Sequence, residues 1–594
     1  MSKRRSSLAI SPAKRAALAG VAALGLTAAA IAQERPESLL PPGFGEAPST
    51  PAPTPTPVAT MPATAPRVTA TTPAGALPPL PPLPFPSPTA SPSPAPTPRY
   101  ELPAFARRSL AAVGTDQGFA RDAFGAADGR YVERLMRYLS APLPSRWLSI
   151  ALRRLLVAQV DTPRGINGAD FAAERAWLLL RMGESVSARA VAQAVDSDRV
   201  TPKLRQVWMQ TALATADPGA LCPLAAQAGD SERAWIVARA MCAGLTGAAR
   251  TQPLVSDIRR RRVASGIDLQ LAQKVMGAGL NSRQAISIEW APVTELTAWR
   301  FGLATATGVA IPDDLYATVA PQVTAWRALA PGIPLAERAL PAERAAAMGV
   351  MSNAALVDLY AALADGEDAP AALTTTANAL RDAYAATDRA TRVAAMVRLW
   401  DAAETPDARY ARLILTARAA ARLGAVDGEK QADRLIAAML SAGLDRTAQR
   451  WQGHVPANGD GWAMLLLADP DGYGRLSAAA VFDYAPSGPL AARKRQLFFA
   501  GLAGLGRLST GDVADLGERL GVPVAGENAW TRALERAARD GQPGTVLLLS
   551  AIGMQTGDWA GVPPAALYRI VAALRDVGMD GEARMIAAEA LARL

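Results

Sequence analysis

AALYRIVAALRDV, residues 565–577, is followed by Gly578 and by EARMIAAEAL, residues 582–591. The first segment predicts one helix, and Gly578 predicts the turn that ends it. The second segment predicts a returning helix, whose alanines at 583, 587, 588 and 590 allow two helices to pack closely. The end of the chain is therefore expected to be an antiparallel helical hairpin.

The same type of segment recurs from residue 99 to the end. Helical spacing of apolar residues follows Ser145, Ser352 and Thr391, each a residue type that favours the start of a helix. Turn signals rich in Gly, Pro and Asp separate such segments, as at 217–219 and 469–472. No convincing strand pattern exceeds a few residues. The body, residues 99–594, is predicted to be all-α.

The C-terminal hairpin resembles those of tetratricopeptide repeats. A similar sequence pattern occurs at 177–183, followed by alanines at 188 and 192, and at 420–424, followed by an alanine at 432. The resemblance implies a right-handed solenoid of stacked helical hairpins, a TPR-like superhelix of degenerate repeats. Uneven spacing assigns the chain to no particular characterised repeat family. A compact multi-helix domain fits the same periodicity and stays open.

The N-terminus, residues 1–32, has the pattern of a secretory signal peptide. Basic residues precede the uncharged run 16–32, and the small residues Ala30 and Ala32 predict cleavage before Gln33. Export would place the chain in the periplasm or outside the cell. The alternative is an uncleaved run 16–32 that tethers the chain to the inner membrane, although 17 residues is short for a span.

Residues 33–98 form a Pro/Ala/Thr-rich segment that separates the signal from the body. Proline occupies 22 of the 63 positions from 36 to 98. Because proline fixes φ and lacks a backbone donor, the tract excludes helix and sheet and favours polyproline II. The sequence predicts a disordered linker that acts as a spacer.

Charge argues against a nucleic-acid partner. The sequence pI is 9.8 and the formal net charge is +9. Five basic residues and no acidic residue precede residue 33, so the cleaved chain would carry +4. The basic character therefore belongs largely to the signal and predicts no nucleic-acid surface.

Two features of the body are candidate sites. Cys222 and Cys242 are the only cysteines, and in an exported chain an even pair favours one disulfide. If Gly229-Asp230-Ser231 is the turn between two helices, the cysteines would be offset by about 6 Å along the helix axes, so two buried thiols remain the alternative.

The other candidate is the run Arg259, Arg260, Arg261 and Arg262, which could contact an anion or an acidic partner. Four successive residues point around a helix, so either one arginine lies near the packed side or the helix ends there. A solvated helix end with favourable dipole interactions is the alternative.

No catalytic, cofactor or metal motif is complete. The glycine-rich stretch 501–511 lacks the lysine of a phosphate loop, and Ala480 stands where a calcium loop starting at Asp469 needs a carboxylate. His454, the sole histidine, lies in a loop with Asp460 nearby and is expected to be solvent-exposed. The sequence predicts no catalytic residue, no cofactor and no metal.

One enzyme class stays as an alternative. Residues 550–555, SAIGMQ, resemble part of the Gly-Leu-Met-Gln motif of exported lytic transglycosylases, some of which carry an α-superhelix. That resemblance implies a peptidoglycan-cleaving enzyme, but the upstream Glu-Ser pair that supplies the acid has no match at Glu527 or Glu535.

The sequence thus predicts an exported, non-catalytic protein-interaction or envelope-scaffolding protein that binds an envelope protein or peptidoglycan. Stacked hairpins would offer a concave surface to the partner. Tryptophans are expected either to anchor that interface or to fill gaps between alanine-rich helices; they are Trp235, Trp326, Trp451, Trp462 and Trp530.

Overall fold

The computed structural model describes residues 103–594, except 116, 230–231, 280–285, 367–368, 473 and 487. The predicted signal peptide, its cleavage site, the membrane tether and the whole proline-rich linker lie outside these residues. The described residues before 108 form no part of the body's compact unit and carry the short 3-10 helix η2 (Ala104–Ala106). The remaining description concerns the body from residue 108 onward.

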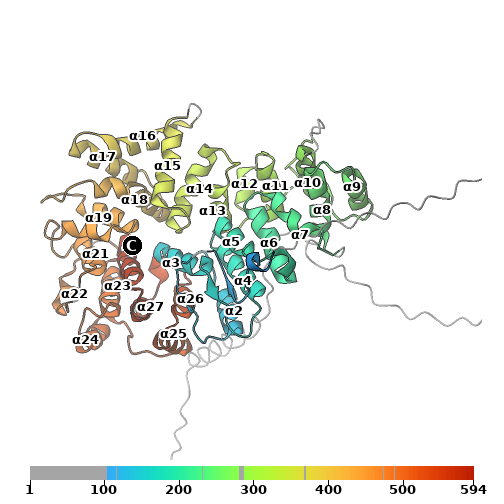
Figure 1. Ribbon diagram of the computed structural model, residues 1–594. Coiled ribbons are helices and arrows are strands. Elements are labelled where there is room, and N and C mark those ends of the chain that lie inside the picture. The colour runs from blue at the N-terminus through green and yellow to red at the C-terminus, as the bar shows by residue number, and fades with distance from the viewer. Residues whose placement is uncertain are drawn as a thin grey trace, which may run out of the picture. The chain divides into compact units, whose positions relative to one another are not determined.

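The body is predominantly helical, which confirms the all-α prediction (Figure 1). Its first helices are α2 Gly129–Tyr138, α3 Arg146–Val157, α4 Gly168–Arg181, α5 Ser185–Ala192, α6 Pro202–Ala214, α7 Cys222–Ala225, α8 Arg233–Leu245, α9 Thr251–Arg260, α10 Gly266–Gly279 and α11 Ala298–Ala306. The next are α12 Asp313–Tyr316, α13 Gln322–Leu329, α14 Leu335–Ala347, α15 Asn353–Ala364, α16 Ala371–Ala385, α17 Arg389–Asp401, α18 Pro406–Ala421, α19 Ala432–Ser441 and α20 Asp445–Ala448. The last are α21 Asp460–Ala468, α22 Ala479–Asp483, α23 Ala491–Gly504, α24 Thr510–Leu520, α25 Ala529–Arg539, α26 Pro543–Gly553, α27 Pro564–Asp576 and α28 Asp580–Ala592.

Short elements complete the described body. Four 3-10 helices join the α-helices: η3 Ser197–Arg199, η4 Pro218–Leu221, η5 Gln449–Trp451 and η6 Trp559–Gly561. Two short strands, β1 Ala112–Val113 and β2 Val160–Asp161, pair antiparallel. Among the described residues, no helix combines the length and the apolar character that crossing a bilayer requires.

Helix starts follow the capping chemistry that the sequence indicated, with one correction. The Ser145 hydroxyl accepts from the Leu148 N–H at the start of α3, and Ser352 caps α15 in the same way. Thr391 does not begin a helix. Instead Asp388, three residues earlier, caps α17 by accepting from the Thr391 N–H, so the helix begins at Arg389.

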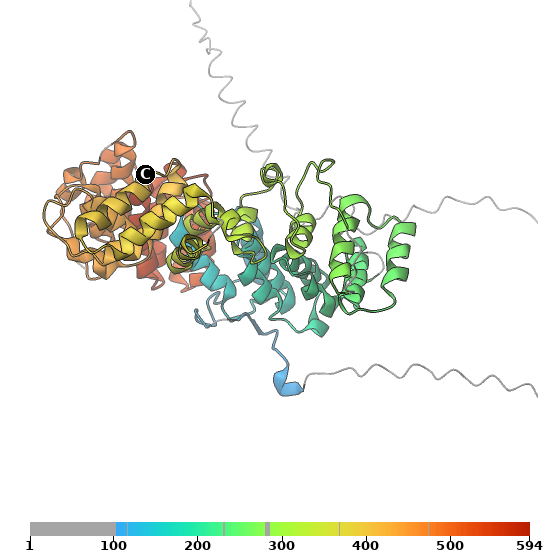
Figure 2. The same ribbon diagram turned by 90° about the horizontal axis from the view of Figure 1, so that it is seen from above.

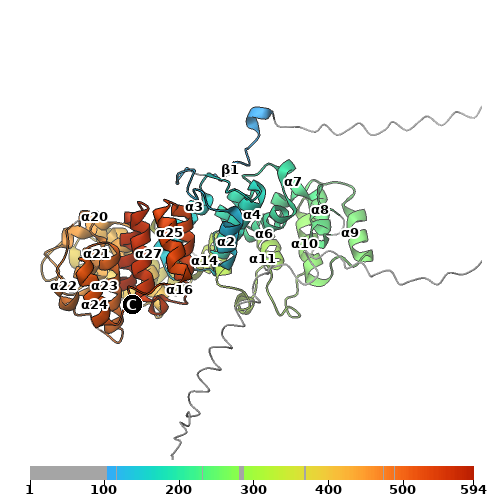
Figure 3. The ribbon, with the colours of Figure 1, turned by 90° about the horizontal axis from the view of Figure 1, so that it is seen from below.

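Helices adjacent in the chain pack against one another along much of the body. In Figure 2 the green helices α8, α9 and α10 run side by side, with α8 in contact with both others. Figure 3 shows α23, α27 and α25 in a similar row, and the hairpin expected from 565–591 is the pair α27 and α28. Gly578 makes its turn at φ +80°, a value that glycine adopts without strain.

The last helices also return to the first ones, which a strictly nearest-neighbour stack would not do. α26 packs on α2 and α3, and α28 packs on α3 as well as on α19 and α21. Glu589 of α28 accepts from the Ser145 hydroxyl (2.7 Å) and from the Arg146 and Trp147 N–H groups (2.8 and 3.2 Å). The C-terminal helix thus caps the N-terminus of α3, 444 residues away in sequence.

A second buried ionic cluster joins α14, α15 and α18. Glu343 lies 2.9 Å from the Arg412 guanidinium and also accepts from the Tyr360 hydroxyl. All three residues are buried, with 4%, 8% and 0% of their surfaces exposed. Burial raises the pKa of Glu343, although Arg412 and Tyr360 oppose the shift. The cluster fixes three helices to one another by charge as well as by apolar contact.

All five tryptophans singled out in the sequence pack against other residues, and three of them are buried as the gap-filling interpretation expects. Trp235, Trp326 and Trp451 are at most 2% exposed. Trp462 packs its ring on Phe498, and Trp530 donates to the Leu549 carbonyl. Large rings thus fill space that small alanine side chains leave between helices, whereas a role of the half-buried Trp462 and Trp530 as interface anchors stays a prediction.

Candidate functional site

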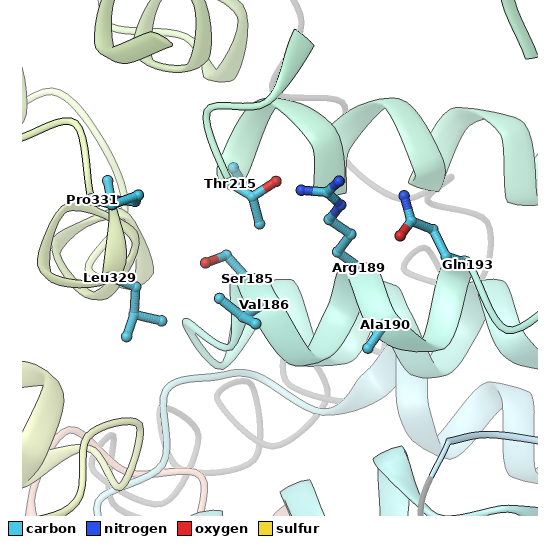
Figure 4. Close-up of a pocket in the computed structure, with 10 residues that line it drawn as sticks. Ser185, Val186, Arg189, Ala190, Gln193, Thr215, Leu329 and Pro331 are labelled. Carbon is cyan, nitrogen blue, oxygen red and sulfur yellow. The ribbon is translucent and has the colours of Figure 1, made fainter. Parts of the chain in front are cut away.

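The described body has a half-open groove of about 390 Å³ beside α5 (Figure 4). One face of α5 and its C-terminal cap form the floor. The end of α6 forms a second side, and the connection from α13 to α14 forms the third. The lining residues are Ser185, Val186, Arg189, Ala190, Gln193, Ala214, Thr215, Leu329, Ala330 and Pro331.

The turn before α5 brings the walls of the groove together. Gly183 has φ +89°, and a Cβ built there would lie 2.7 Å from the Ala325 Cβ of α13. Only glycine therefore allows both the turn and the close approach of α13. Trp326, the next residue of α13, donates from its indole to the Leu180 carbonyl at the end of α4.

Glu184 fixes the start of α5 to the middle of the body. Its carboxylate accepts from Arg153 of α3 and from the Ser187 hydroxyl, both at 3.1 Å. Arg153 also donates to the Gly349 carbonyl, which follows α14. Burial raises the pKa of Glu184, while Arg153 and Ser187 favour its charged form. The floor of the groove is thus held by a partly buried ion pair.

Ser185 carries the unusual polar atom of the site. The residue is 1% exposed, and its Oγ has no hydrogen-bond partner among the described residues. In Figure 4 the hydroxyl points from α5 into the space in front of Leu329. A buried hydroxyl without a partner costs stability, so a ligand that accepts from it would recover that cost.

Arg189 places a guanidinium at the side of the groove. Its Nη2 lies 2.6 Å from the Asp217 carboxylate, which also caps η4 by accepting from the Ala220 N–H. The two side chains of the pair are 30% and 42% exposed. Such a pair contributes little to stability, but it leaves the other N–H groups of Arg189 for a ligand and neutralises the charge of the groove.

Val186 and Thr215 complete the character of the site. Val186 is 59% exposed, a high value for a large apolar side chain beside a concavity. The Thr215 hydroxyl donates back to the Thr211 carbonyl of α6 at 2.8 Å. Among the described residues that line the groove there is neither a carboxylate nor an imidazole. The lining thus combines hydroxyl, amide and guanidinium groups with apolar side chains, which can hydrogen-bond to and pack against a ligand.

The predicted pair Cys222 and Cys242 forms a disulfide in the structure, with 5.5 Å between the Cα atoms. The offset expected for two long antiparallel helices does not arise. Instead, the chain before α8 is the 3-10 helix η4 followed by the four-residue helix α7, which starts at Cys222 itself. This short, turned segment brings Cys222 alongside the last turn of α8.

Reducing this disulfide is expected to destabilise the part of the body around α7 and α8. For a closed loop of about 20 residues, chain entropy predicts a loss of about 3 kcal/mol. We expect the Cys222→Ser, Cys242→Ala variant to show faster hydrogen exchange in α7 and α8 than the oxidised wild type, with α23 and α27 unchanged. Equal exchange in both chains would mean that the disulfide contributes nothing there.

The four arginines lie at a helix end. α9 stops at Arg260, Arg261 is its C-cap, and Arg262 has the left-handed φ of 52°. All four are exposed, and Arg260 and Arg261 pair with Asp257 (2.5 and 3.2 Å). This matches the solvated-end interpretation of the run. The run and the disulfide are not part of the groove.

Three other residues noted in the sequence have structural partners. His454 is partly exposed and pairs with Asp427 (2.8 Å), whereas Asp460 binds the Tyr484 hydroxyl and Lys494. The Gln555 side chain of the transglycosylase-like fragment accepts from the Ser140 N–H at 2.7 Å. Within the described residues no group of three or more His, Cys, Asp or Glu side chains is placed to hold a metal ion.

Sequence reasoning did not find the groove. Its residues come from 185–193, 214–215 and 329–331, and none belongs to a recognisable motif. The only signal was the segment 177–183, noted as one of the hairpin-like stretches, which leads directly into α5. Comparison of the chain with protein-family models, curated proteins and solved structures gives no significant match in any of the three.

Proposed function

We propose that this protein is an exported, non-catalytic interaction protein that acts as a scaffold in the cell envelope. In this proposal, residues 1–32 direct export and the tract 33–98 spaces the body from the membrane or its surroundings. The helical hairpins form a degenerate, TPR-like right-handed solenoid, and an envelope protein or peptidoglycan is the partner.

The observation that carries the proposal is the groove beside α5. It combines an exposed aliphatic side chain, Val186, with the buried and unpartnered Ser185 hydroxyl. Interaction sites typically place a few polar groups within an apolar concavity, so that the polar groups orient a partner and apolar contact holds it. Helical repeat proteins use their surfaces for such contacts.

Site-specific crosslinking in cells tests this function. We expect a photo-crosslinking residue at Val186 of the full chain to yield discrete adducts in the envelope fraction. The matched control is Val426, which is also an exposed valine but lies after α18 and does not line the groove. Adducts at Val186 that are absent at Val426 would support an interaction protein.

Other outcomes would contradict the proposed function. Absence of adducts at Val186, or the same adducts at both positions, would contradict an interaction site in the groove. Release of anhydromuropeptides when the purified chain is incubated with peptidoglycan would contradict the non-catalytic assignment. That result would favour the transglycosylase-like alternative.

A further inference from the structure

The polar groups on the groove floor are regularly spaced. Ser185, Arg189 and Gln193 follow one another at intervals of four residues, so all three lie on one face of α5 and its C-cap (Figure 4). At about 1.5 Å rise per residue the interval is about 6 Å. In an extended peptide, groups on one side repeat every second residue, at about 6.6–6.8 Å. The spacing of the polar groups on the groove floor is therefore close to the spacing of groups on one side of an extended peptide.

The apolar lining fits the side chains of such a segment. Val186 follows Ser185 and Ala190 follows Arg189, so both apolar side chains lie beside the row of polar groups on α5. Leu329 and Pro331 face them from the α13–α14 connection. A volume of about 390 Å³ is near the lower end for ligand pockets. A short extended segment with small side chains needs less room than a helix, which is about 10–12 Å across with its side chains.

The charges indicate an uncharged ligand. Asp217 already balances Arg189 at 2.6 Å, so the groove offers N–H donors without a net positive charge. The Ser185 hydroxyl and the Gln193 amide add neutral donors. Backbone carbonyls of a peptide are the acceptors that suit all three, because they are neutral and recur along the chain.

We infer that the groove binds an extended, uncharged peptide segment of a partner protein, with small or aliphatic side chains. Its backbone carbonyls accept from Ser185, Arg189 and Gln193, and alternate side chains pack between Val186 and Leu329. This inference rests on the proposed interaction function and specifies its partner and site.

Fluorescence anisotropy with the full chain tests the inference. The probe is a fluorescein-labelled hexapeptide of alternating valine and alanine, blocked at both ends by acetyl and amide groups. We expect saturable binding that Ser185→Ala weakens about three- to tenfold, the effect of one lost hydrogen bond. Because the unpartnered hydroxyl costs stability in the free protein, the same variant should melt at or above the wild-type temperature.

Matched variants separate binding from folding. Ser550 is also buried with an unpartnered Oγ, but it lies in α26 outside the groove, so Ser550→Ala should leave peptide affinity unchanged. Ala190→Trp should fill the groove and abolish binding. Its control is Ala372→Trp, at an exposed alanine of α16. Equal affinities of the wild type and Ser185→Ala, or of Ala190→Trp and Ala372→Trp, would overturn the inference.

A second probe with a free C-terminal carboxylate distinguishes recognition of a chain end. Tight binding of that probe alone would overturn the inference, because it would assign Arg189 to a carboxylate. Failure of both probes together with specific Val186 adducts in cells would overturn the extended-peptide ligand and keep the interaction function. Failure of the probes and of crosslinking would overturn both.

Discussion

Replacing Glu589 by alanine is expected to lower the free energy of unfolding by about 3–5 kcal/mol. The carboxylate is fully buried and accepts from the Ser145 hydroxyl and from two N–H groups at the start of α3. Its removal leaves these donors, and the Arg593 guanidinium 3.3 Å away, without their acceptor, and it removes a negative charge near the buried Arg146. Burial already lowers the pKa of Arg146, which the nearby Glu589 charge partly offsets. Urea denaturation of the full chain measures the loss.

Glu582→Ala is the matched control, because Glu582 also lies on α28 and also contacts α3. It pairs with Arg154 at 2.9 Å, but the two side chains are 23% and 49% exposed. An exposed pair of this type contributes about 1 kcal/mol at most. If the two variants lost the same free energy of unfolding, the buried cap at α3 would contribute no more to the contact between α28 and α3 than an exposed ion pair does.

Replacing Glu343 by leucine is expected to have a similar effect, about 3–5 kcal/mol, for a different reason. The substitution leaves the Arg412 guanidinium buried without its carboxylate, and two of its nitrogens already have no hydrogen-bond partner among the described residues. Removing all three polar partners together, in the variant Glu343→Leu, Arg412→Met, Tyr360→Phe, should restore most of the lost stability. A triple variant as unstable as the single one would contradict this explanation.

The pH dependence of the cluster provides an independent check. Burial raises the folded-state pKa of Glu343 above its ordinary value of 4.5, so between the two values the folded state holds more protons than the unfolded state. The contribution of this carboxyl to stability therefore increases as the pH falls through its folded-state pKa. The wild type should gain stability relative to Glu343→Gln on mild acidification. A constant difference would show that the carboxyl does not titrate in this way.

Local patterns in the sequence predict the helical class and many helix ends. Amphipathic spacing and capping residues act within one or two turns, so they predicted α3, α15 and the hairpin of α27 and α28 directly. The same local reasoning allowed a helix end at the arginine run, where α9 does stop. It also proposed the pairing of Cys222 with Cys242, although it expected a less favourable geometry because the short helix α7 was not foreseen.

Which distant segments meet depends on packing between parts of the chain that are far apart in sequence. The capping of α3 by Glu589 and the groove between Ser185 and Leu329 join residues that no local pattern relates. Whether a tryptophan is buried depends on the residues that pack around it in space, and the sequence on either side of it does not show this. Helix formation depends on contacts between residues three or four positions apart, so a local sequence pattern predicts it. Burial, pairing and the absence of a partner depend instead on which residues pack opposite a side chain.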